Sequence, residues 1–250
     1  MPPKKKAPAK APAKTQQKQK FIPRTQRKIN HVLDHVGSGD TFHYLKSFNP
    51  LTGFEAGQEV IFTEKWDGTT VQATNQAIFK RIDKIQKGDT RKHSANEEQR
   101  YNLEELDLDN PKNKYIAKAV ANYLDTFKQL EEGECVYFEA LGTLIGSRFQ
   151  HIKDFYDIKV FDFSRNGNFL SFEETIELAE KYNLPITNSF TEKLDIDRVI
   201  QRLSDPTCYD DADAQLEGFV IREAGYDLLD GGKIGKFRVD DVPKIKVQSE

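Results

Sequence analysis

Residues 60–71 read Val-Ile-Phe-Thr-Glu-Lys-Trp-Asp-Gly-Thr-Thr-Val, and they are the most informative stretch of the chain. Lys65 follows a strand-like run, and β-branched residues resume at Thr69. A lysine at the edge of a strand can point into a pocket, and Asp-Gly lets the backbone turn beside a phosphate. Lysine is also one of the few side chains that act as covalent nucleophiles. By itself, however, Lys-x-Asp-Gly equally describes a solvated lysine beside an ordinary hairpin turn.

Four further segments follow in order and give the pattern its weight. Residues 136–142 (VYFEALG) form a predicted strand with one glutamate, and residues 159–163 (KVFDF) form a second apolar strand with an embedded aspartate. Residues 216–222 (LEGFVIR) form a Glu-Gly strand, and residues 233–238 (KIGKFR) form a basic strand. The ordered series is far more specific than any one of its members.

The series resembles the covalent nucleotidyltransferases, which include ATP-dependent DNA and RNA ligases and the mRNA-capping guanylyltransferases. The resemblance covers the chain from about residue 60 to its end. It implies two packed antiparallel sheets around a nucleotide groove. The chain's own pattern agrees, because predicted strands outnumber helices and mostly follow one another, which is typical of an α+β domain with flanking helices.

Secondary structure follows from the spacing of apolar residues and from capping signals. Strands dominate residues 59–82, and the polar residues 86–112 are interpreted as a loop. Helices are predicted over residues 25–36, ending at Gly37-Ser38-Gly39, and over residues 116–130. A capping box at Ser171 begins a third helix, and an apolar stripe over residues 196–203 predicts a fourth.

Charge is distributed very unevenly along the 250 residues. The net charge is −3, but residues 1–33 hold ten Lys or Arg and no acidic residue. The remaining 27 basic residues face 40 acidic ones, so the rest of the chain carries −13. Residues 1–20 lack large apolar groups other than Met1, which predicts a disordered basic arm ahead of one domain over residues 21–250. Such an arm suits contact with nucleic-acid phosphates, nuclear import or mere solubility.

Two further observations concern location. No apolar run is long enough to span a bilayer or to form a secretory signal. The cysteines Cys135 and Cys208 lie far apart and are interpreted as reduced thiols. Both observations favour an intracellular protein of the nucleus or cytoplasm, with no membrane contact.

The resemblance implies a role for each motif residue. Lys65 is the nucleophile that attacks the α-phosphate of ATP and carries AMP as a phosphoramidate. Glu139 and Glu217 are the expected ligands of Mg²⁺, with Mn²⁺ as an alternative, because hard cations need carboxylates. Phe161 stacks on the purine. The other nucleotide-binding residues implied are Glu64, Asp67, Gly68, Lys80, Arg81, Glu139, Lys233 and Lys236.

Each assignment competes with a plainer structural reading. Glu217 could pair with Arg222 across a hairpin, Phe161 could belong to the core, and Lys233 and Lys236 could form a solvated strand face. The last motif is usually Lys-x-Lys, and here residues 233–238 compete with Lys244 and Lys246. Lys236 is favoured by its distance from the Glu-Gly strand. The chain ends at Glu250, so we expect no C-terminal OB-fold.

The residues after Asp-Gly favour one branch of the family. DNA ligases and capping enzymes have an arginine soon after it, whereas this chain has Thr69 and Thr70. Lys-x-Asp-Gly-Thr, Phe-Glu-Ala-Leu-Gly and Val-Phe-Asp-Phe all resemble RNA ligases. The sequence therefore predicts a monomeric ATP-dependent RNA ligase that joins 5′-phosphate and 3′-hydroxyl ends, with the arm contacting RNA. The alternatives are a DNA ligase, a guanylyltransferase, and a nucleic-acid-binding relative without turnover.

Overall fold

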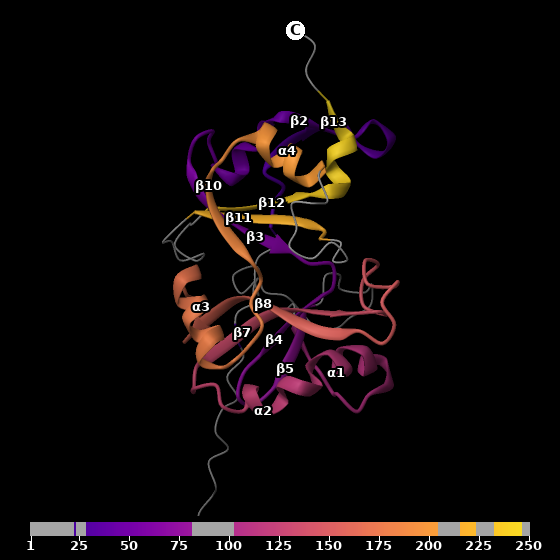
Figure 1. The fold of residues 1–250 in the computed structure, drawn as a ribbon, viewed down its shortest axis with the longest axis vertical. Coiled ribbons are helices and arrows are strands. Elements are labelled where there is room, and N and C mark those ends of the chain that lie inside the picture. The colour runs from indigo at the N-terminus through magenta and orange to yellow at the C-terminus, as the bar shows by residue number, and fades with distance from the viewer. Residues whose placement is uncertain (1–22, 24–28, 82–102, 205–215, 224–232, 247–250) are drawn as a thin grey trace, which may run out of the picture.

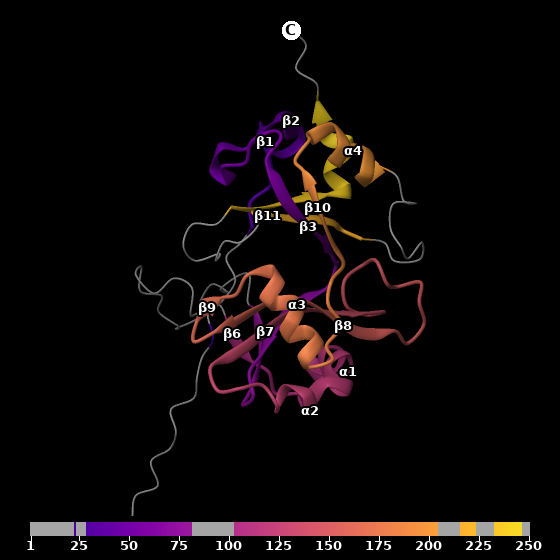
Figure 2. The same ribbon diagram turned by 60° about the vertical axis from the view of Figure 1, so that its left-hand side comes forward.

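A computed structural model describes residues 23, 29–81, 103–204, 216–223 and 233–246. Its centre is a pair of antiparallel sheets, one above the other, as Figures 1 and 2 show from two sides. The basic arm and Cys208 lie outside the described residues, whereas Cys135 is a buried free thiol of the lower sheet. Among the described residues, no helix is long and apolar enough to cross a membrane.

The upper sheet has four strands in the order β10-β3-β11-β12, and every neighbouring pair is antiparallel. The strands are β10 (Ser189–Lys193), β3 (Glu59–Lys65), β11 (Gly218–Glu223) and β12 (Ile234–Arg238). Above it lies a small sheet of β1 (Leu33–Val36), β2 (His43–Phe48) and β13 (Ile245–Lys246). In this small sheet β13 pairs with β2 in parallel.

The lower sheet has six strands in the order β6-β5-β4-β7-β8-β9, also antiparallel throughout. They are β6 (Leu103–Glu105), β5 (Ile78–Arg81), β4 (Thr69–Ala73), β7 (Glu134–Gly142), β8 (Tyr156–Arg165) and β9 (Asn168–Phe169). The helices are α1 (Lys114–Val120), α2 (Leu124–Phe127) and α3 (Phe172–Lys181), which cover the lower sheet, and α4 (Ile196–Ser204), which lies above the upper sheet (Figure 1).

Each sheet has its own apolar core on the face turned away from the other sheet. Val60 and Phe62 of β3 and Ile221 of β11 belong to the upper core, together with residues of α4. Phe138 and Val160 of the lower sheet pack into a separate core with α1, α2 and α3. Side chains alternate along a strand, so the other face of each sheet points into the space between them. Polar residues of these strands point into this space.

One irregularity in β8 matters for this inner space. Val160 lies opposite Phe138 of β7, and Asp162 lies opposite Tyr137, so Phe161 is an extra residue without a partner on β7. Such a β-bulge redirects the side chains beside it. Phe161 lines the space between the sheets, and Asp162 reaches an arginine of the upper sheet. The consecutive residues Phe161 and Asp162 therefore both point to the inner face of the sheet.

The predicted α+β class with two packed antiparallel sheets is confirmed, as are the last two helices and, over the described residues 59–81, the predicted strands. Ser171 caps α3 with the predicted capping box. The helix predicted over residues 25–36 is wrong where it is described, because Leu33–Val36 form β1, paired with β2. The helix over residues 116–130 is broken into α1, a 3-10 turn and α2, and Tyr123 at the break donates its hydroxyl to Asp157 at 2.5 Å.

The loop prediction for residues 86–112 can be compared with the structure only from residue 103 onward. This part holds the short edge strand β6 and a 3-10 turn at Pro111–Asn113. The remaining residues of the predicted loop lie outside the described residues.

Candidate active site

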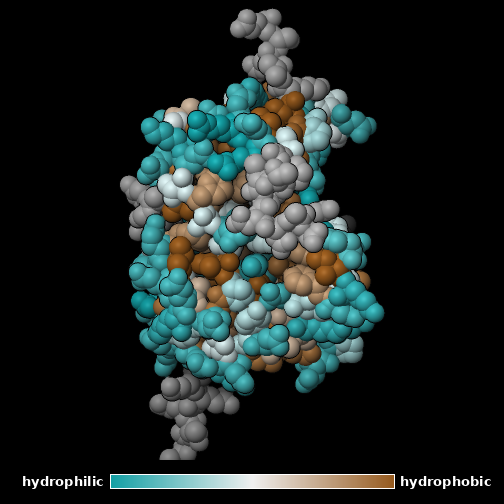
Figure 3. Space-filling view, viewed as in Figure 1, coloured by the Kyte–Doolittle hydropathy of each residue, from teal (hydrophilic) through white to brown (hydrophobic). Residues whose placement is uncertain are grey.

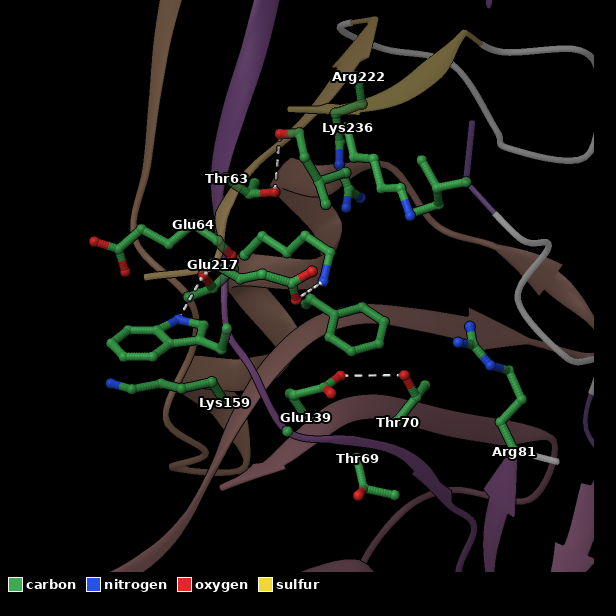
Figure 4. A pocket seen from close by; sticks show the side chains of 17 residues that line it. Thr63, Glu64, Thr69, Thr70, Arg81, Glu139, Lys159, Glu217, Arg222 and Lys236 are labelled. Atoms are coloured by element: carbon green, nitrogen blue, oxygen red, sulfur yellow. Dashed lines mark hydrogen bonds and ion pairs between the residues drawn. The ribbon is translucent and has the colours of Figure 1, made fainter. Parts of the chain in front are cut away.

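A cavity of about 450 Å³ lies between the two sheets. Strands β3, β11 and β12 form its upper wall, and β4, β5, β7 and β8 form its lower wall (Figure 4). On the face shown in Figure 3, hydrophobic side chains gather across the middle of the molecule, where the two halves meet. The lining residues are Ile29, Thr63, Glu64, Lys65, Trp66, Gly68, Thr69, Thr70, Arg81, Glu139, Lys159, Phe161, Thr187, Glu217, Val220, Arg222 and Lys236.

Lys65 is the last residue of β3, and it is tied to Glu217 twice. The Glu217 N–H donates to the Lys65 carbonyl at 2.8 Å, which continues the pairing of β3 with β11. The Lys65 amine in turn donates to Oε2 of the Glu217 carboxylate. Both side chains are largely but not fully covered, with 23% and 18% exposed. The strand register thus places a lysine amine and a carboxylate together at the centre of the pocket.

Gly68 explains why glycine follows Asp67 in the turn after Lys65. A Cβ at Gly68 would lie 2.3 Å from the carbonyl oxygen of Ala140 and 2.8 Å from Cγ of Glu139. The turn therefore packs directly on β7, which only glycine allows. Asp67 faces the other way, and its Oδ2 accepts hydrogen bonds from the Ser147 N–H and hydroxyl, both at 2.8 Å.

Glu139 stands on the lower wall beneath Lys65. Its Oε2 accepts a hydrogen bond from the Thr70 hydroxyl at 3.1 Å. Burial raises the pKa of Glu139 from 4.5 to about 7, although the Lys65 charge, the Thr70 hydrogen bond and the Arg81 charge oppose the shift. The charge of Glu217 adds to the rise. The carboxyl group is thus held near its titration point at neutral pH, and a cation placed beside it would favour the ionised form.

Lys236 extends from β12 into the cavity. Its backbone is paired on the outer edge, because the Lys236 N–H donates to the Asn30 carbonyl at 2.9 Å and the Val32 N–H donates to the Lys236 carbonyl at 3.0 Å. Burial lowers the pKa of the Lys236 ammonium, and the charges of Lys65 and Arg238 lower it further. This cation is fixed in position and partly desolvated, which suits it to bind an anion.

A buried ion pair joins the two walls. Arg222 of β11 donates from Nη1 to Oδ1 of Asp162 on β8 at 2.5 Å, and both side chains are almost fully covered. The Arg222 guanidinium also lies over the Phe172 ring, 5.1 Å from its centroid. The alternative that Arg222 pairs with Glu217 is wrong. Both residues line the cavity, but each has a different partner, because Glu217 accepts from Lys65 and Arg222 donates to Asp162.

The structure brings most of the predicted nucleotide-binding residues together. Those that line the cavity are Lys65, Glu64, Gly68, Arg81, Glu139, Phe161, Glu217 and Lys236. Figure 4 shows the Glu64 carboxylate at the outer edge, turned away from the central carboxylates, where Oε1 accepts from the Asn188 amide at 3.1 Å. Of Lys236 and Lys244, two candidates for the last motif, Lys236 lines the cavity and Lys244 does not.

Three predicted residues are not brought to the cavity: Asp67, Lys80 and Lys233. Lys80 adjoins Arg81 on β5, so only one of the two side chains can face the inner space. The Lys80 ammonium lies 3.7 Å from Oε2 of Glu104 instead. Lys233 is three residues from Lys236 and so points to the other face. Its ammonium lies 3.4 Å from the side-chain oxygen of Gln58.

Sequence reasoning missed three residues that help to shape the site. Thr70 holds Glu139, Arg222 joins the walls, and Lys159 places its ammonium 5.6 Å from the Trp66 ring centroid. The sequence signal that could have identified Lys159 and Arg222 is the period of two along each strand. Lys159 lies two residues before Phe161, and Arg222 lies two residues after the cavity-lining Val220, so each shares a face with a recognised or lining residue.

The donor set fits a divalent cation that arrives with phosphates. Glu139 and Glu217 both line the cavity, and the charge of Glu217 acts on Glu139. Within the described ranges no group of three His, Cys, Asp or Glu side chains lies close enough to hold a metal ion. A hard cation can take one or two carboxylates and fill its other positions with phosphate oxygens and water.

Comparison with known proteins identifies the family of this chain and shows proteins of similar fold. A family model described as RNA ligase matches residues 58–239. An archaeal ATP-dependent RNA ligase has a similar fold, with a TM-score of 0.51 and 14% identity over 88% of this chain and 49% of that one. A putative ATP-dependent DNA ligase from Aquifex aeolicus has a TM-score of 0.51 and 19% identity, covering 90% of this chain and 55% of that one.

An RNA ligase of Naegleria gruberi, in a mutant form with ATP and Mn, matches with a TM-score of 0.48 and 14% identity over 87% of this chain and 62% of that one. No curated protein matches the sequence significantly. The chain spans about half the length of the archaeal structure that it matches.

Proposed function

This chain belongs to the RNA ligase family, and we propose that it joins RNA 5′-phosphate and 3′-hydroxyl ends with ATP, through an AMP carried on Lys65. One observation carries the proposal. The Lys65 amine lies at the centre of a cavity between two carboxylates, Glu217 and Glu139, with the desolvated cation Lys236 on the same wall. A lysine nucleophile, acidic metal ligands and a phosphate-binding cation are the three groups that nucleotidyl transfer to an amine requires.

In the first step the Lys65 nitrogen attacks the α-phosphorus of ATP. An N–P bond forms, the bond to the bridging oxygen breaks, and pyrophosphate leaves with that electron pair. The attacking amine must be neutral, so the ammonium proton has to leave first, and Glu217 Oε2 already accepts a hydrogen bond from this nitrogen. Lys236 and Arg81 would stabilise the charge that develops on the phosphate oxygens.

The next two steps use the stored AMP. An oxygen of the RNA 5′-phosphate attacks the AMP phosphorus and releases the Lys65 amine, which takes up a proton. The RNA 3′-hydroxyl then attacks the activated 5′-phosphate, and AMP leaves as the phosphodiester forms. Phe161 offers a ring face on which the adenine can stack. A divalent ion held by Glu139 and Glu217 would supply Lewis-acid charge at the phosphates, with Mg²⁺ the expected ion and Mn²⁺ the alternative.

The basic arm, residues 1–20, is proposed to contact the RNA phosphates rather than to take part in adenylylation. We further propose that the protein acts as a monomer inside the cell.

Covalent labelling tests the proposal directly. The protein is incubated with α-labelled ATP and Mg²⁺, denatured, and digested to locate the label. We expect AMP on Lys65 of the wild type and no label on Lys65→Ala. Lys193→Ala, an exposed lysine on the neighbouring strand β10, is the matched control and should label normally.

Two comparisons then separate the alternatives. Labelling by GTP rather than ATP would favour a guanylyltransferase, and sealing of nicked DNA in preference to RNA would favour a DNA ligase. Absence of any covalent label on the wild type would leave the non-catalytic nucleic-acid binder as the better reading.

A further inference from the structure

A chain of polar contacts runs from Lys65 through Glu217 to residues far from the cavity. Oε1 of Glu217, the oxygen that does not accept from Lys65, lies 4.0 Å from Nη1 of Arg238. Arg238 donates in turn to both oxygens of Asp241, from Nη2 at 3.0 Å and from Nε at 3.4 Å. Nδ1 of His31 lies 2.8 Å from Oδ2 of Asp241.

The geometry of Glu217 needs support from its side chain as well as from its backbone. Its N–H and carbonyl are fixed by Lys65 at 2.8 Å and by the Val239 N–H at 2.9 Å. These bonds leave the carboxylate free to rotate about its side-chain torsions. Because Lys65 binds one oxygen and Arg238 faces the other, the carboxylate is held between two cations in one orientation.

Asp241 is what fixes Arg238. It lies in the 3-10 turn after β12 and is only 3% exposed. Burial alone would raise the pKa of Asp241, but hydrogen bonds from His31 and Arg238 lower it to about 2, so the carboxylate is charged at any physiological pH. A guanidinium that donates twice to one carboxylate has a fixed plane as well as a fixed position. Arg238 itself does not line the cavity, so its effect on the reaction passes through Glu217.

A buried ion pair of this kind is weak support for stability, because removing the two charges from water costs much of what their attraction returns. The ion pair has a clearer effect on the orientation of the Arg238 side chain. We propose that Asp241 is a positioning residue for adenylylation: by fixing Arg238 it orients Glu217, and thereby the Lys65 amine, for attack on the α-phosphate. This inference rests on the proposed function. It adds Asp241, and His31 which contacts Asp241, to the residues on which that function depends.

The test is single-turnover formation of the protein–AMP adduct over a range of ATP concentrations. We expect Asp241→Asn to lower the maximal rate about 10- to 100-fold, since small misplacements of a reacting group have effects of this size. The ATP concentration that gives half the maximal rate should stay within about twofold, because ATP binding does not involve this residue. Asp240→Asn is the matched control. It removes the same charge one residue away, where the carboxylate is exposed and pairs only loosely with Arg148 at 3.2 Å.

A double-mutant cycle separates positioning from general loss of structure. If Asp241 acts through Arg238, Asp241→Asn should have little further effect in an Arg238→Gln background. Equal slowing in both backgrounds would overturn the inference, as would a wild-type rate in Asp241→Asn. Should Asp241→Asn fail to fold, Arg238→Gln alone must show the same loss of rate at unchanged half-saturation, and a normal rate there would also refute the inference. A wild type that forms no adduct would overturn the proposed function and this inference together.

Discussion

Replacing Glu139 with glutamine should make the protein more stable at alkaline pH while it impairs the site. Burial raises the pKa of Glu139 to about 7 in the folded protein, against 4.5 for an ordinary glutamate. Between these two values the folded state binds more protons than the unfolded state, so this carboxyl group makes the free energy of unfolding fall as pH rises. Glutamine has nearly the same shape as the protonated acid and does not titrate.

The size of the effect follows from the two pKa values. Each unit between them is worth about 1.4 kcal/mol, so the ionised carboxyl costs about 3 kcal/mol of stability once the pH exceeds 7. At pH 5 most of this cost is absent, and the difference between Glu139→Gln and wild type should be about 1 kcal/mol. By pH 8 the variant should exceed the wild type by about 3 kcal/mol.

Urea unfolding of both proteins without divalent metal, at half-unit intervals from pH 5 to pH 8.5, measures this difference. Subtracting the two curves removes the contribution of every other titrating group. Glu59→Gln serves as the control because Glu59 is an exposed glutamate at the start of β3. A difference between Glu139→Gln and wild type that does not change with pH would refute the argument. If Glu139 binds Mg²⁺ as proposed, saturating Mg²⁺ should shrink the gap, because the cation stabilises the ionised carboxylate of the wild type only.

Four other outcomes are expected. Glu217→Gln should slow protein–AMP formation by about 100-fold or more at any Mg²⁺ concentration, because it removes the proposed metal ligand and the carboxylate that binds the Lys65 amine; quench-flow labelling measures this, and near-normal turnover would contradict a role for Glu217 in the reaction. Gly68→Ala places a Cβ 2.3 Å from a carbonyl oxygen of β7, so it should lower both the melting temperature and the labelling rate, and an unchanged protein would show that the turn is not tightly packed. Arg222→Ala removes the guanidinium that binds the buried Asp162 carboxylate and should cost about 3–5 kcal/mol in denaturant unfolding; the paired change with Asp162→Ala should recover part of this loss, and simple additivity would contradict the pairing. Deletion of residues 1–20 should leave the adduct intact but weaken RNA binding at low salt and flatten its salt dependence; equal binding at every salt concentration would show that the arm does not contact RNA.

The sequence predicts the fold well because the motif segments are strands with a clear period of two. Lys65 ends a strand-like run, Glu139 and Glu217 stand beside apolar residues, and the resemblance assigns each of the three a place around one groove. The structure brings them to one cavity. The same period explains the failures at Lys80 and Lys233, since adjacent or odd-spaced residues of a strand without a bulge point to opposite faces. Alternating the faces along each strand from Arg81 and from Lys236 would have excluded Lys80 and Lys233 from the cavity.

Other features depend on contacts between distant segments, which local patterns do not contain. The residues before Gly37 have helical spacing, yet Leu33–Val36 pair with β2 as a strand, because tertiary pairing outweighs a weak local preference. The joining of the two walls by Arg222 and the contact of His31 with Asp241 likewise need the three-dimensional arrangement. No spacing rule links positions 60 residues apart.

The bulge in β8 has a consequence for how this protein can change during evolution. In a regular strand Phe161 and Asp162 would face opposite ways, and one of them would enter the core. The extra residue lets Phe161 line the cavity while the next residue, Asp162, forms the ion pair that links the two walls. A single-residue deletion here would restore a regular ladder but would give up one of the two roles. We therefore expect the two positions to change together, and substitutions near them should be judged by their effect on the bulge before their effect on either side chain.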